Sequence, residues 1–332
     1  MIPIGVTARN EAKNILVLLA SLREAVHRAS SVLGCTYELH VLLNDNDDHT
    51  PDLLAGEADL TIHHTHGGIV EAQRVLVEQC GGSAPFLVFS DADIRVEPDT
   101  LIEITRVMLS CPEVEVAYAE KYPIAPLRAT PLAKALYLYN LREGYQTTRH
   151  YFNGQFFAIR HWNIPKPEEL HWDSSADTPF LNLAAGIRVD DMYLSREVLS
   201  RMGPCAIRCV PAGIHYRPPE TLRGMFRKYQ RMRLEIERLN RYFPRTQTAH
   251  QKWGRRRIDH RALSAAPFSE KLRYALFHAA LGLCKIAYHV QKAWYTYLSD
   301  RPCPTWFPVT ETKCPVAPIA PESSSPASAS EQ

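Results

Sequence analysis

Residues 85–93 read PFLVFSDAD, an apolar run followed at once by two aspartates that stand one residue apart. The apolar part, PFLVF, has the length and composition of a buried strand. A turn after such a strand usually takes Gly, Asn or a single Asp, and a second carboxylate at close range adds like-charge repulsion. The stretch therefore predicts a strand end whose two carboxylates face a positive group.

Strand and helix patterns alternate on both sides of this stretch. Segments with a strand pattern lie at 2–8, 37–44, 61–68 and 114–122, and segments with helical spacing lie between them at 10–26, 69–79 and 98–109. This alternation predicts the α/β class, with a Rossmann-like, mostly parallel sheet flanked by helices. Ligands bind such sheets at the carboxyl ends of the strands, where the polar turns 7–11, 44–50 and 90–93 fall.

The bulk composition is that of a globular protein. The chain has 332 residues, 45% hydrophobic and 22% charged, and its net charge of +2 excludes a polyelectrolyte. Its eight cysteines are scattered, and the pair Cys205 and Cys209 has no second pair at the spacing of a metal site. A strand pattern begins at residue 2, with no secretory leader before it. We therefore expect reduced thiols and a cytoplasmic protein.

The composition changes after about residue 220. An arginine-rich helical segment at 221–245 is followed by an amphipathic helix at 271–297, and the Pro/Ser-rich stretch 301–332 is expected to be disordered. We predict a catalytic domain at 1–220, a basic and amphipathic helical extension at 221–300, and a tail at 301–332. Charges interrupt 271–297 too often for a membrane span. Its apolar face is expected to pack on the domain, on a second subunit or on the inner face of a membrane.

Six motifs in order carry a resemblance that covers roughly residues 2–235. They are IGVTARNEAKNI, VLLNDNDDHT, DAD at 91–93, YFNGQFFAIRH, IRVDDMYLS and YQRMR. Together they resemble the family 2 glycosyltransferases of the GT-A fold. The resemblance implies inverting transfer of a sugar from a nucleotide-diphosphate sugar, with UDP as the expected nucleotide and Mn²⁺ or Mg²⁺ as the cofactor.

The resemblance also assigns a donor site. It implies nucleotide contacts from the first strand end, the second strand end and the first aspartate of the DAD motif: Thr7, Ala8, Arg9, Glu11, Asn44, Asp48 and Asp91. The metal would be held by Asp93 and Asp91, two hard oxygen ligands, with His215 as a third ligand. Ordinary structural explanations stay open: a helix N-terminal pair at Asn10 and Glu11, a capping Asp at the DAD turn, and a structural histidine.

The catalytic and acceptor residues are implied in the same way. Asp191 would be the general base that takes the proton of the acceptor hydroxyl, and Asp190 would stand beside it. The donor or acceptor would contact Asn153, Gly154, Gln155, Gln230 and Arg233. Asp190 and Asp191 are also suited to cap the helix that follows them. Gln230 and Arg233 match only part of a motif of polymer synthases, because Leu234 stands where that motif has Trp.

Two other functions stay open at this stage. One is a catalytically inactive nucleotide-binding protein of the same fold, and the other is a sugar nucleotidyltransferase, although TARNEAKN lacks the glycines of a pyrophosphorylase loop. The expected partners are a nucleotide-sugar donor and a sugar, lipid-linked or small-molecule acceptor with a hydroxyl group. Nucleic acid is not expected, because aromatic residues are sparse among the arginines.

Overall fold

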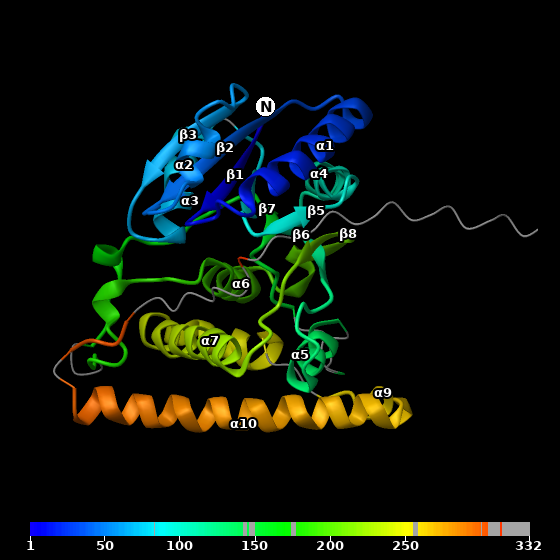
Figure 1. Ribbon diagram of the computed structural model, residues 1–332. Helices are drawn as coiled ribbons and strands as arrows, with labels where there is room; N and C mark the ends of the chain where they lie inside the picture. Colours follow the sequence, from blue (N-terminus) through cyan, green and yellow to red (C-terminus); the bar gives the residue numbers. More distant parts are fainter. Residues whose placement is uncertain are drawn as a thin grey trace, which may run out of the picture.

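The computed structural model has an eight-stranded sheet at its centre, with strand order β3-β2-β1-β4-β7-β6-β8-β5 (Figure 1). The structure describes residues 1–82, 84–141, 145, 150–173, 177–254, 258–299, 301–304 and 313. The strands are β1 (Ile2–Ala8), β2 (Tyr37–Asn44), β3 (Leu60–Thr65), β4 (Leu87–Asp91), β5 (Ile94–Val96), β6 (Val116–Pro123), β7 (Phe156–Ile159) and β8 (Ile207–Tyr216). The predicted α/β class is confirmed.

The sheet is mixed rather than fully parallel. The pairs β1–β2, β1–β4, β2–β3 and β6–β8 are parallel, whereas β7 runs antiparallel between β4 and β6. Phe157 of β7 pairs with Phe89 on one side and Tyr118 on the other. The antiparallel strand brings the segment 153–155, directly before it, to the carboxyl end of β4.

Helices cover both faces of the sheet. They are α1 (Ile15–Leu33), α2 (Thr50–Leu54), α3 (Ile69–Cys80), α4 (Thr100–Ser110), α5 (Pro131–Leu141), α6 (Asp190–Arg201), α7 (Leu222–Tyr242), α8 (Gln247–Ala249), α9 (His260–Ala265) and α10 (Phe268–Tyr297). Single turns of 3₁₀ or π-helix lie at Pro167–Glu169, Leu183–Ala185, Pro204–Ala206, Pro244–Thr246 and His250–Gly254. The three helices predicted between the early strands correspond to α1, α3 and α4.

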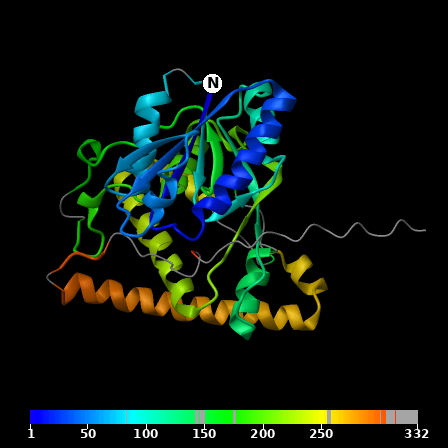
Figure 2. The same ribbon diagram turned by 45° about the horizontal axis from the view of Figure 1, so that its top comes forward.

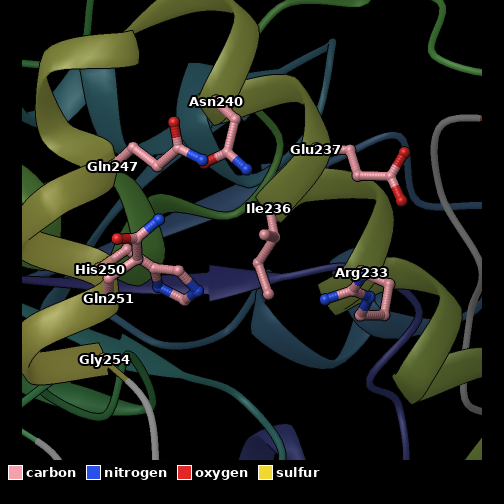
Figure 3. Close-up of a pocket in the computed structure, with 8 residues that line it drawn as sticks. All are labelled: Arg233, Ile236, Glu237, Asn240, Gln247, His250, Gln251 and Gly254. Carbon is pink, nitrogen blue, oxygen red and sulfur yellow. The ribbon is translucent and has the colours of Figure 1, made fainter.

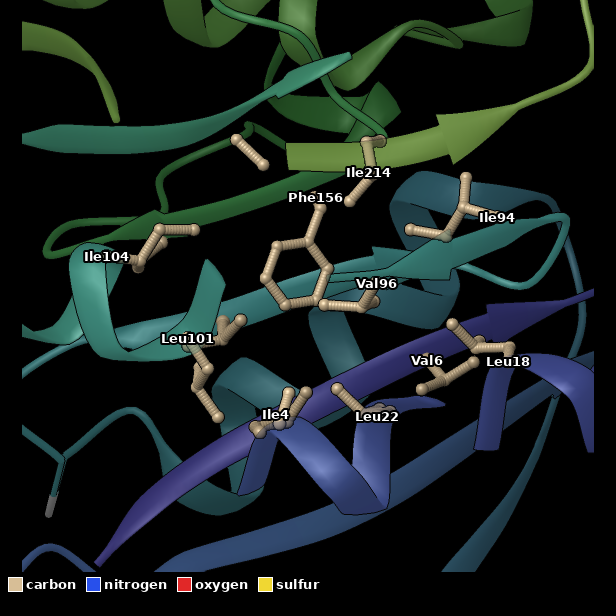
Figure 4. Packing of buried hydrophobic residues seen from close by; sticks show 14 of the residues in the cluster. Ile4, Val6, Leu18, Leu22, Ile94, Val96, Leu101, Ile104, Phe156 and Ile214 are labelled. Atoms are coloured by element: carbon tan, nitrogen blue, oxygen red, sulfur yellow. The ribbon is translucent and has the colours of Figure 1, made fainter. Parts of the chain in front are cut away.

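Each face of the sheet has its own apolar core. On one face, α1 and α4 pack Leu18, Leu22 and Leu101 against Ile4 of β1 and Phe156 of β7 (Figure 4). These side chains are at most 4% exposed, and burial of this kind is the main stabilising term in folding. The spacing of Ile15, Leu18, Leu19 and Leu22 predicted this face of α1. Gly34, in the left-handed conformation at φ 65°, ends the helix.

The other core joins the sheet to the C-terminal helices. It contains Leu76 of α3, Phe157 of β7, Leu194 of α6, Leu234 of α7 and Tyr288 of α10. Helix α7 therefore shares a core with the strands, although the sequence analysis placed it in an extension after residue 220. The boundary of that extension stays a prediction.

Helix α10 lies along the side of the molecule away from the sheet in both views, and beneath α5 and α7 in Figure 1 (Figures 1 and 2). Two contacts attach its inner face. The rings of Tyr139 and Phe277 stack with their centroids 3.6 Å apart, and Lys292 Nζ lies 2.5 Å from Glu237 Oε2. One face of the helix thus packs on its own chain. No helix in the described part of the chain is long and apolar enough to cross a membrane. The predicted tail lies mostly outside the described residues.

Candidate active site

The turns after β1 and β2 are joined by hydrogen bonds. The Asn10 amide donates to Asn46 Oδ1 at 2.6 Å, and the Asp47 amide donates to Asn10 Oδ1 at 2.9 Å. Asn10 has a φ of 58°, a conformation that asparagine tolerates better than most residues. The Glu11 amide donates to the Thr50 hydroxyl at 2.8 Å. The two strand ends that the sequence analysis assigned to the nucleoside therefore form one surface.

Two of the predicted nucleotide residues already have structural partners on this surface. Asp48 accepts from the Ala12 amide at 3.0 Å and from the Thr50 amide at 2.9 Å. Burial acts to raise the pKa of Asp48, but the bonds from Thr50 and Ala12 outweigh it and lower the pKa. The buried Asn44 accepts from the Gly68 amide at 3.0 Å, which ties β2 to the start of α3. Both side chains thus hold the turns in shape.

Backbone carbonyl groups at the end of β1 also form part of this surface. Thr7 Oγ1 donates to the Ser90 carbonyl at 3.4 Å, and the Ala8 carbonyl accepts from Asn46 Nδ2 at 3.1 Å. Arg9 is exposed. The carbonyls of Arg9 and Asn10 both accept from the ammonium group of Lys313.

Glu11 is buried beside these turns, and Lys313 reaches it from the far end of the chain. Lys313 Nζ lies 2.5 Å from Glu11 Oε1, and Asn14 Nδ2 donates to Glu11 Oε2 at 3.0 Å. Burial, followed by the negative charge of Asp93, raises the pKa of Glu11 to about 6, against the opposing effect of Lys313. The negative charge of Asp93 in the DAD motif therefore acts on the carboxyl group of Glu11. Nothing in the sequence around Lys313 indicated that it reaches the site.

Asp91 and Asp93 stand at the end of β4, where the sequence analysis placed them. The Asp91 amide donates to the Gln155 carbonyl at 2.8 Å, which joins β4 to the segment before β7. Burial raises the pKa of Asp91 well above its ordinary value, and the charges of Asp93 and Asp190 raise it further. Asp190 and Asp191 of α6 therefore interact electrostatically with the DAD turn at the carboxyl end of the sheet, because their charges raise the pKa of Asp91.

Asp190 is held by a buried relay that the sequence analysis missed. Gln73 Nε2 donates to Asp190 Oδ2 at 2.7 Å, and Trp162 Nε1 donates to Gln73 Oε1 at 2.9 Å. Burial, followed by the charge of Asp191, raises the pKa of Asp190 to about 7. One signal was present in the sequence: Gln73 is a polar residue on the apolar face of α3, between the buried Val70 and Leu76.

Asp191 begins α6 and lies against the backbone of Gly154. The Gly154 amide donates to Asp191 Oδ2 at 3.3 Å, and a Cβ at position 154 would lie 2.8 Å from Asp191 Cβ. From the sequence, Gly154 was expected to contact the donor or acceptor. In the structure it allows close approach to Asp191. The neighbouring Asn153 is buried, and its Nδ2 has no hydrogen-bond partner among the described residues.

His215 is not grouped with the two aspartates of the DAD motif. Its Nε2 lies 3.1 Å from Glu97 Oε1, in a part of β8 that pairs with β5. Among the residues that the structure describes, no three His, Cys, Asp or Glu side chains are placed to hold a metal ion. Mg²⁺ commonly binds through one or two carboxylates together with substrate phosphates. The mutually repelling carboxylates of Asp91 and Asp93 fit that mode of binding.

Arg231 supplies positive charge beside the acid cluster, which comprises Glu11, Asp91, Asp93, Asp190 and Asp191. Arg231 of α7 attracts Asp91 and opposes the rise of its pKa. Arg188, directly before α6, donates to the Gly67 carbonyl at 2.5 Å and approaches the turn after β3. Arg231 belongs to the arginine-rich helical segment predicted at 221–245. Arg188 was not singled out.

Gln230 and Arg233, the predicted acceptor pair, lie in different surroundings. Gln230 is buried, and its amide donates to Gln291 of α10. Arg233 lines a polar cavity of about 410 Å³ (Figure 3). The other lining residues are Ile236, Glu237, Asn240, Gln247, His250, Gln251 and Gly254. Asn240 is tied to α6, because its Oδ1 accepts from Arg196 Nη1 at 2.8 Å. None of the acid cluster lines this cavity.

The stability of the protein should depend on the charge of Asp190. Its pKa is raised from 3.8 to about 7, so between these values the folded protein holds a proton that the unfolded chain releases. Its contribution to stability is therefore largest below pH 4 and falls as the pH rises through 7. Asp190→Asn removes this titration and keeps an acceptor for Gln73. We measure the Tm of Asp190→Asn and of wild type without divalent metal. When the pH is raised from 5 to 8.5, the difference in Tm should shift by several degrees in favour of the variant.

The control for this measurement is Glu24→Gln, which neutralises an exposed acid on α1. Its Tm difference from wild type should be the same at both pH values. A Tm difference for Asp190→Asn that does not change with pH would mean that Asp190 is ionised in the folded protein across this range.

Neither a protein-family model nor a curated protein matches this chain. Among solved structures, it is similar to glucosyl-3-phosphoglycerate synthase from Mycobacterium tuberculosis, in complex with Mn²⁺, UDP-glucose and phosphoglyceric acid, at 17% identity over 72% of this chain and 79% of that one (TM-score 0.44). Mannosyl-3-phosphoglycerate synthase from Rubrobacter xylanophilus is similar at 16% identity over 72% and 74% (TM-score 0.46). S. aureus TarS 1–349 is similar at 14% identity over 90% and 93% (TM-score 0.42).

Proposed function

We propose that this protein is a metal-dependent inverting glycosyltransferase. It would move a sugar from a nucleotide-diphosphate sugar, with UDP as the expected nucleotide, to an acceptor hydroxyl. The observation that carries the proposal is the acid cluster at the carboxyl end of the sheet. Its members come from the ends of β1 and β4 and from the start of α6, and burial raises the pKa of three of them, Glu11, Asp91 and Asp190. Carboxylates gathered in this way favour a cationic ligand.

The donor would lie across the ends of β1, β2 and β4. The joined turns 8–12 and 44–50 would hold the nucleoside, with the exposed residue Arg9 and the buried carboxyl of Glu11 beside it. Asp91 and Asp93 would hold Mn²⁺ or Mg²⁺, which when bound neutralises the charge of the departing diphosphate. Arg231 would bring further positive charge to the same group.

Asp191 would act as the general base. The acceptor oxygen would form a bond to the anomeric carbon, its proton would pass to Asp191, and the bond from the sugar to the diphosphate would break. The Gly154 amide, which donates to Asp191 Oδ2, would hold the carboxylate in position. The unpartnered amide of Asn153 would donate to a hydroxyl of the donor sugar or acceptor. Asp190, fixed by Gln73 and Trp162, would support the start of α6.

Thermal unfolding with nucleotides tests the donor site. We expect one of UDP, GDP, CMP and dTDP to raise the Tm of the wild-type protein, and we expect the rise to require Mn²⁺. A ligand at a hundredfold excess over its Kd adds about 2.7 kcal/mol, which corresponds to a rise of about 4 °C for a chain of this length. Asp93→Ala should remove the metal-dependent part of the rise. Glu113→Ala, at an exposed acid before β6 and outside these turns, is the matched control.

Either of two results would count against the proposed site. If no nucleotide raises the Tm of well-folded protein, the acid cluster is structural and the transferase proposal fails. If a nucleotide raises the Tm equally in wild type and Asp93→Ala, nucleotide binding stands but the assignment of the metal to Asp93 fails.

A further inference from the structure

The cavity beside α7 lies between two helical faces that follow each other in the chain (Figure 3). One wall is a face of α7 and the other is a face of the helical turns at 247–254, and they carry Arg233, Glu237 and Asn240, and Gln247, His250 and Gln251. Steps of three, four and seven residues put side chains on one face of a helix, where packed helices usually carry apolar residues. These six are polar, so the two faces border a polar space of about 410 Å³ instead of a core.

Arg233 is not neutralised by the acid on its own wall. Its Nε is buried and has no hydrogen-bond partner among the described residues. Both oxygens of Glu237 are engaged elsewhere, because Oε1 accepts from the Tyr288 hydroxyl at 3.0 Å and Oε2 accepts from Lys292 Nζ at 2.5 Å. These bonds draw the carboxylate toward α10, and Figure 3 shows it pointing away from the opposite wall. A buried donor without a partner indicates a missing ligand, ion or water.

A second arginine lies behind both walls. Arg196 of α6 is 1% exposed, and it donates from Nη1 to Asn240 Oδ1 at 2.8 Å and from Nε to the Tyr151 hydroxyl at 3.2 Å. The same hydroxyl lies 2.8 Å from His250 Nδ1 on the other wall. Arg196 Nη2 has no hydrogen-bond partner in the part of the chain that the structure describes. Burial lowers the pKa of Arg196, so its positive charge is only partly compensated by the groups around it.

Two short stretches of chain join this cavity to Asp191. On α6, Arg196 follows Asp191 by five residues, which is about 7.5 Å along the helix axis. In the segment before β7, Tyr151 contacts His250 of the cavity wall, and the Gly154 amide donates to Asp191 Oδ2 at 3.3 Å. Three residues of chain span at most about 10 Å. A ligand held in the cavity can therefore extend toward Asp191.

We propose that this cavity binds the anionic group of the acceptor, a carboxylate or a phosphate. The guanidinium of Arg233 would donate to the anionic oxygens in the forked geometry that both groups match. The amides of Gln247 and Gln251 would donate to the remaining oxygens or to hydroxyl groups of the same molecule. The identity of the ligand as an acceptor rests on the proposed transferase function, whereas the binding of an anion does not.

Thermal unfolding with three related sugars, in the absence of nucleotide and metal, tests this site. Glucose 6-phosphate, glucuronate and glucose carry a phosphate, a carboxylate and no charge on the same ring, and sodium chloride keeps the ionic strength equal. We expect at least one of the two anions to raise the Tm in a saturable way and glucose to leave it unchanged. The anion that raises it shows whether the site prefers a phosphate or a carboxylate.

Two variants place the anion in the cavity. Arg233→Gln should weaken its binding by about tenfold or more, because it removes a charge-assisted hydrogen bond. Gln247→Glu should weaken it by a similar factor through repulsion, and Gln247 is exposed, so this variant should fold even if Arg233→Gln does not. The matched controls are Arg241→Gln, at an exposed site on α7, and Gln79→Glu, at an exposed site on α3. Both should bind the anion as wild type does.

Repeating the titration with Mn²⁺ and the nucleotide that raises the Tm separates the two sites. The two rises should add, because the cavity and the donor site are distinct. The proposal is overturned if neither anion raises the Tm, or if both cavity variants bind the anion as wild type does. It is also overturned if the nucleotide abolishes the effect of the anion, which would then occupy the place of the diphosphate. Binding through Arg233 in a protein that binds no nucleotide would support the anion site and overturn its assignment to an acceptor.

Discussion

Replacing Asp191 with Asn is expected to lower kcat for sugar transfer by about 10²–10⁴-fold, with little change in KM for the donor. An amide cannot take the proton of the acceptor hydroxyl, and positioned general bases contribute a factor of this size. The side chain keeps its shape, so the contact with the backbone of Gly154 should survive. The rate is measured as release of the nucleoside diphosphate, using sugar conjugates of the nucleotide that raises the Tm.

The matched control for Asp191→Asn is Glu197→Gln, on the same helix α6, where the carboxylate pairs only with Arg201 among its described contacts. It should retain most of the activity. The nucleotide-induced rise in Tm should be equal in Asp191→Asn and wild type, which shows that the donor site is intact. If Asp191→Asn released nucleotide at the wild-type rate, the base would have to be another group. A wild-type protein that binds a nucleotide but transfers no sugar would favour the binding-only alternative.

Gly154→Ala is expected to lower kcat by about 10²-fold through Asp191. The new methyl carbon would lie 2.8 Å from Asp191 Cβ, closer than real Cβ atoms approach, and 3.1 Å from Asp191 Cγ, which is a tight contact. Asp191 is at the start of a packed helix, so either its side chain or the backbone at 154 has to move. A displacement of about 1 Å at a reacting group is enough for a loss of this size. We expect overpacking to cost about 1–3 kcal/mol of stability as well.

A double-mutant cycle separates the two effects of Gly154→Ala. If the methyl group acts by displacing the base, Gly154→Ala/Asp191→Asn should be no slower than Asp191→Asn alone, because the displaced group is already inactive. Multiplicative losses would mean that Gly154 acts on the substrate directly, as the sequence analysis first suggested. Gly56→Ala is the control, because a Cβ there meets no atom within 4 Å. It should change neither rate nor stability appreciably.

Local pattern was sufficient to predict the strands and helices that come early in the chain. β1, β2 and β4 are short apolar runs that end in polar turns, and α1, α3 and α4 carry an apolar face at helical spacing. These signals are periodic and lie within one element, so they can be read from neighbouring residues. β7 was missed as a strand because FFAI follows a glycine turn and has no alternation. Its antiparallel place between β4 and β6 depends on residues more than 35 positions away.

The sequence alone determined the α/β class and the chemical types at the strand ends, including the paired carboxylates at 91 and 93 and at 190 and 191. Only the tertiary structure decided which groups meet. It brought Glu11 within electrostatic reach of Asp93, set Gln73 and Trp162 behind Asp190, and paired His215 with Glu97 rather than with the aspartates. The reason is physical. Residue type and spacing set local conformation, whereas burial and charge coupling, which shift these pKa values, depend on side chains that only the packing of distant segments brings together.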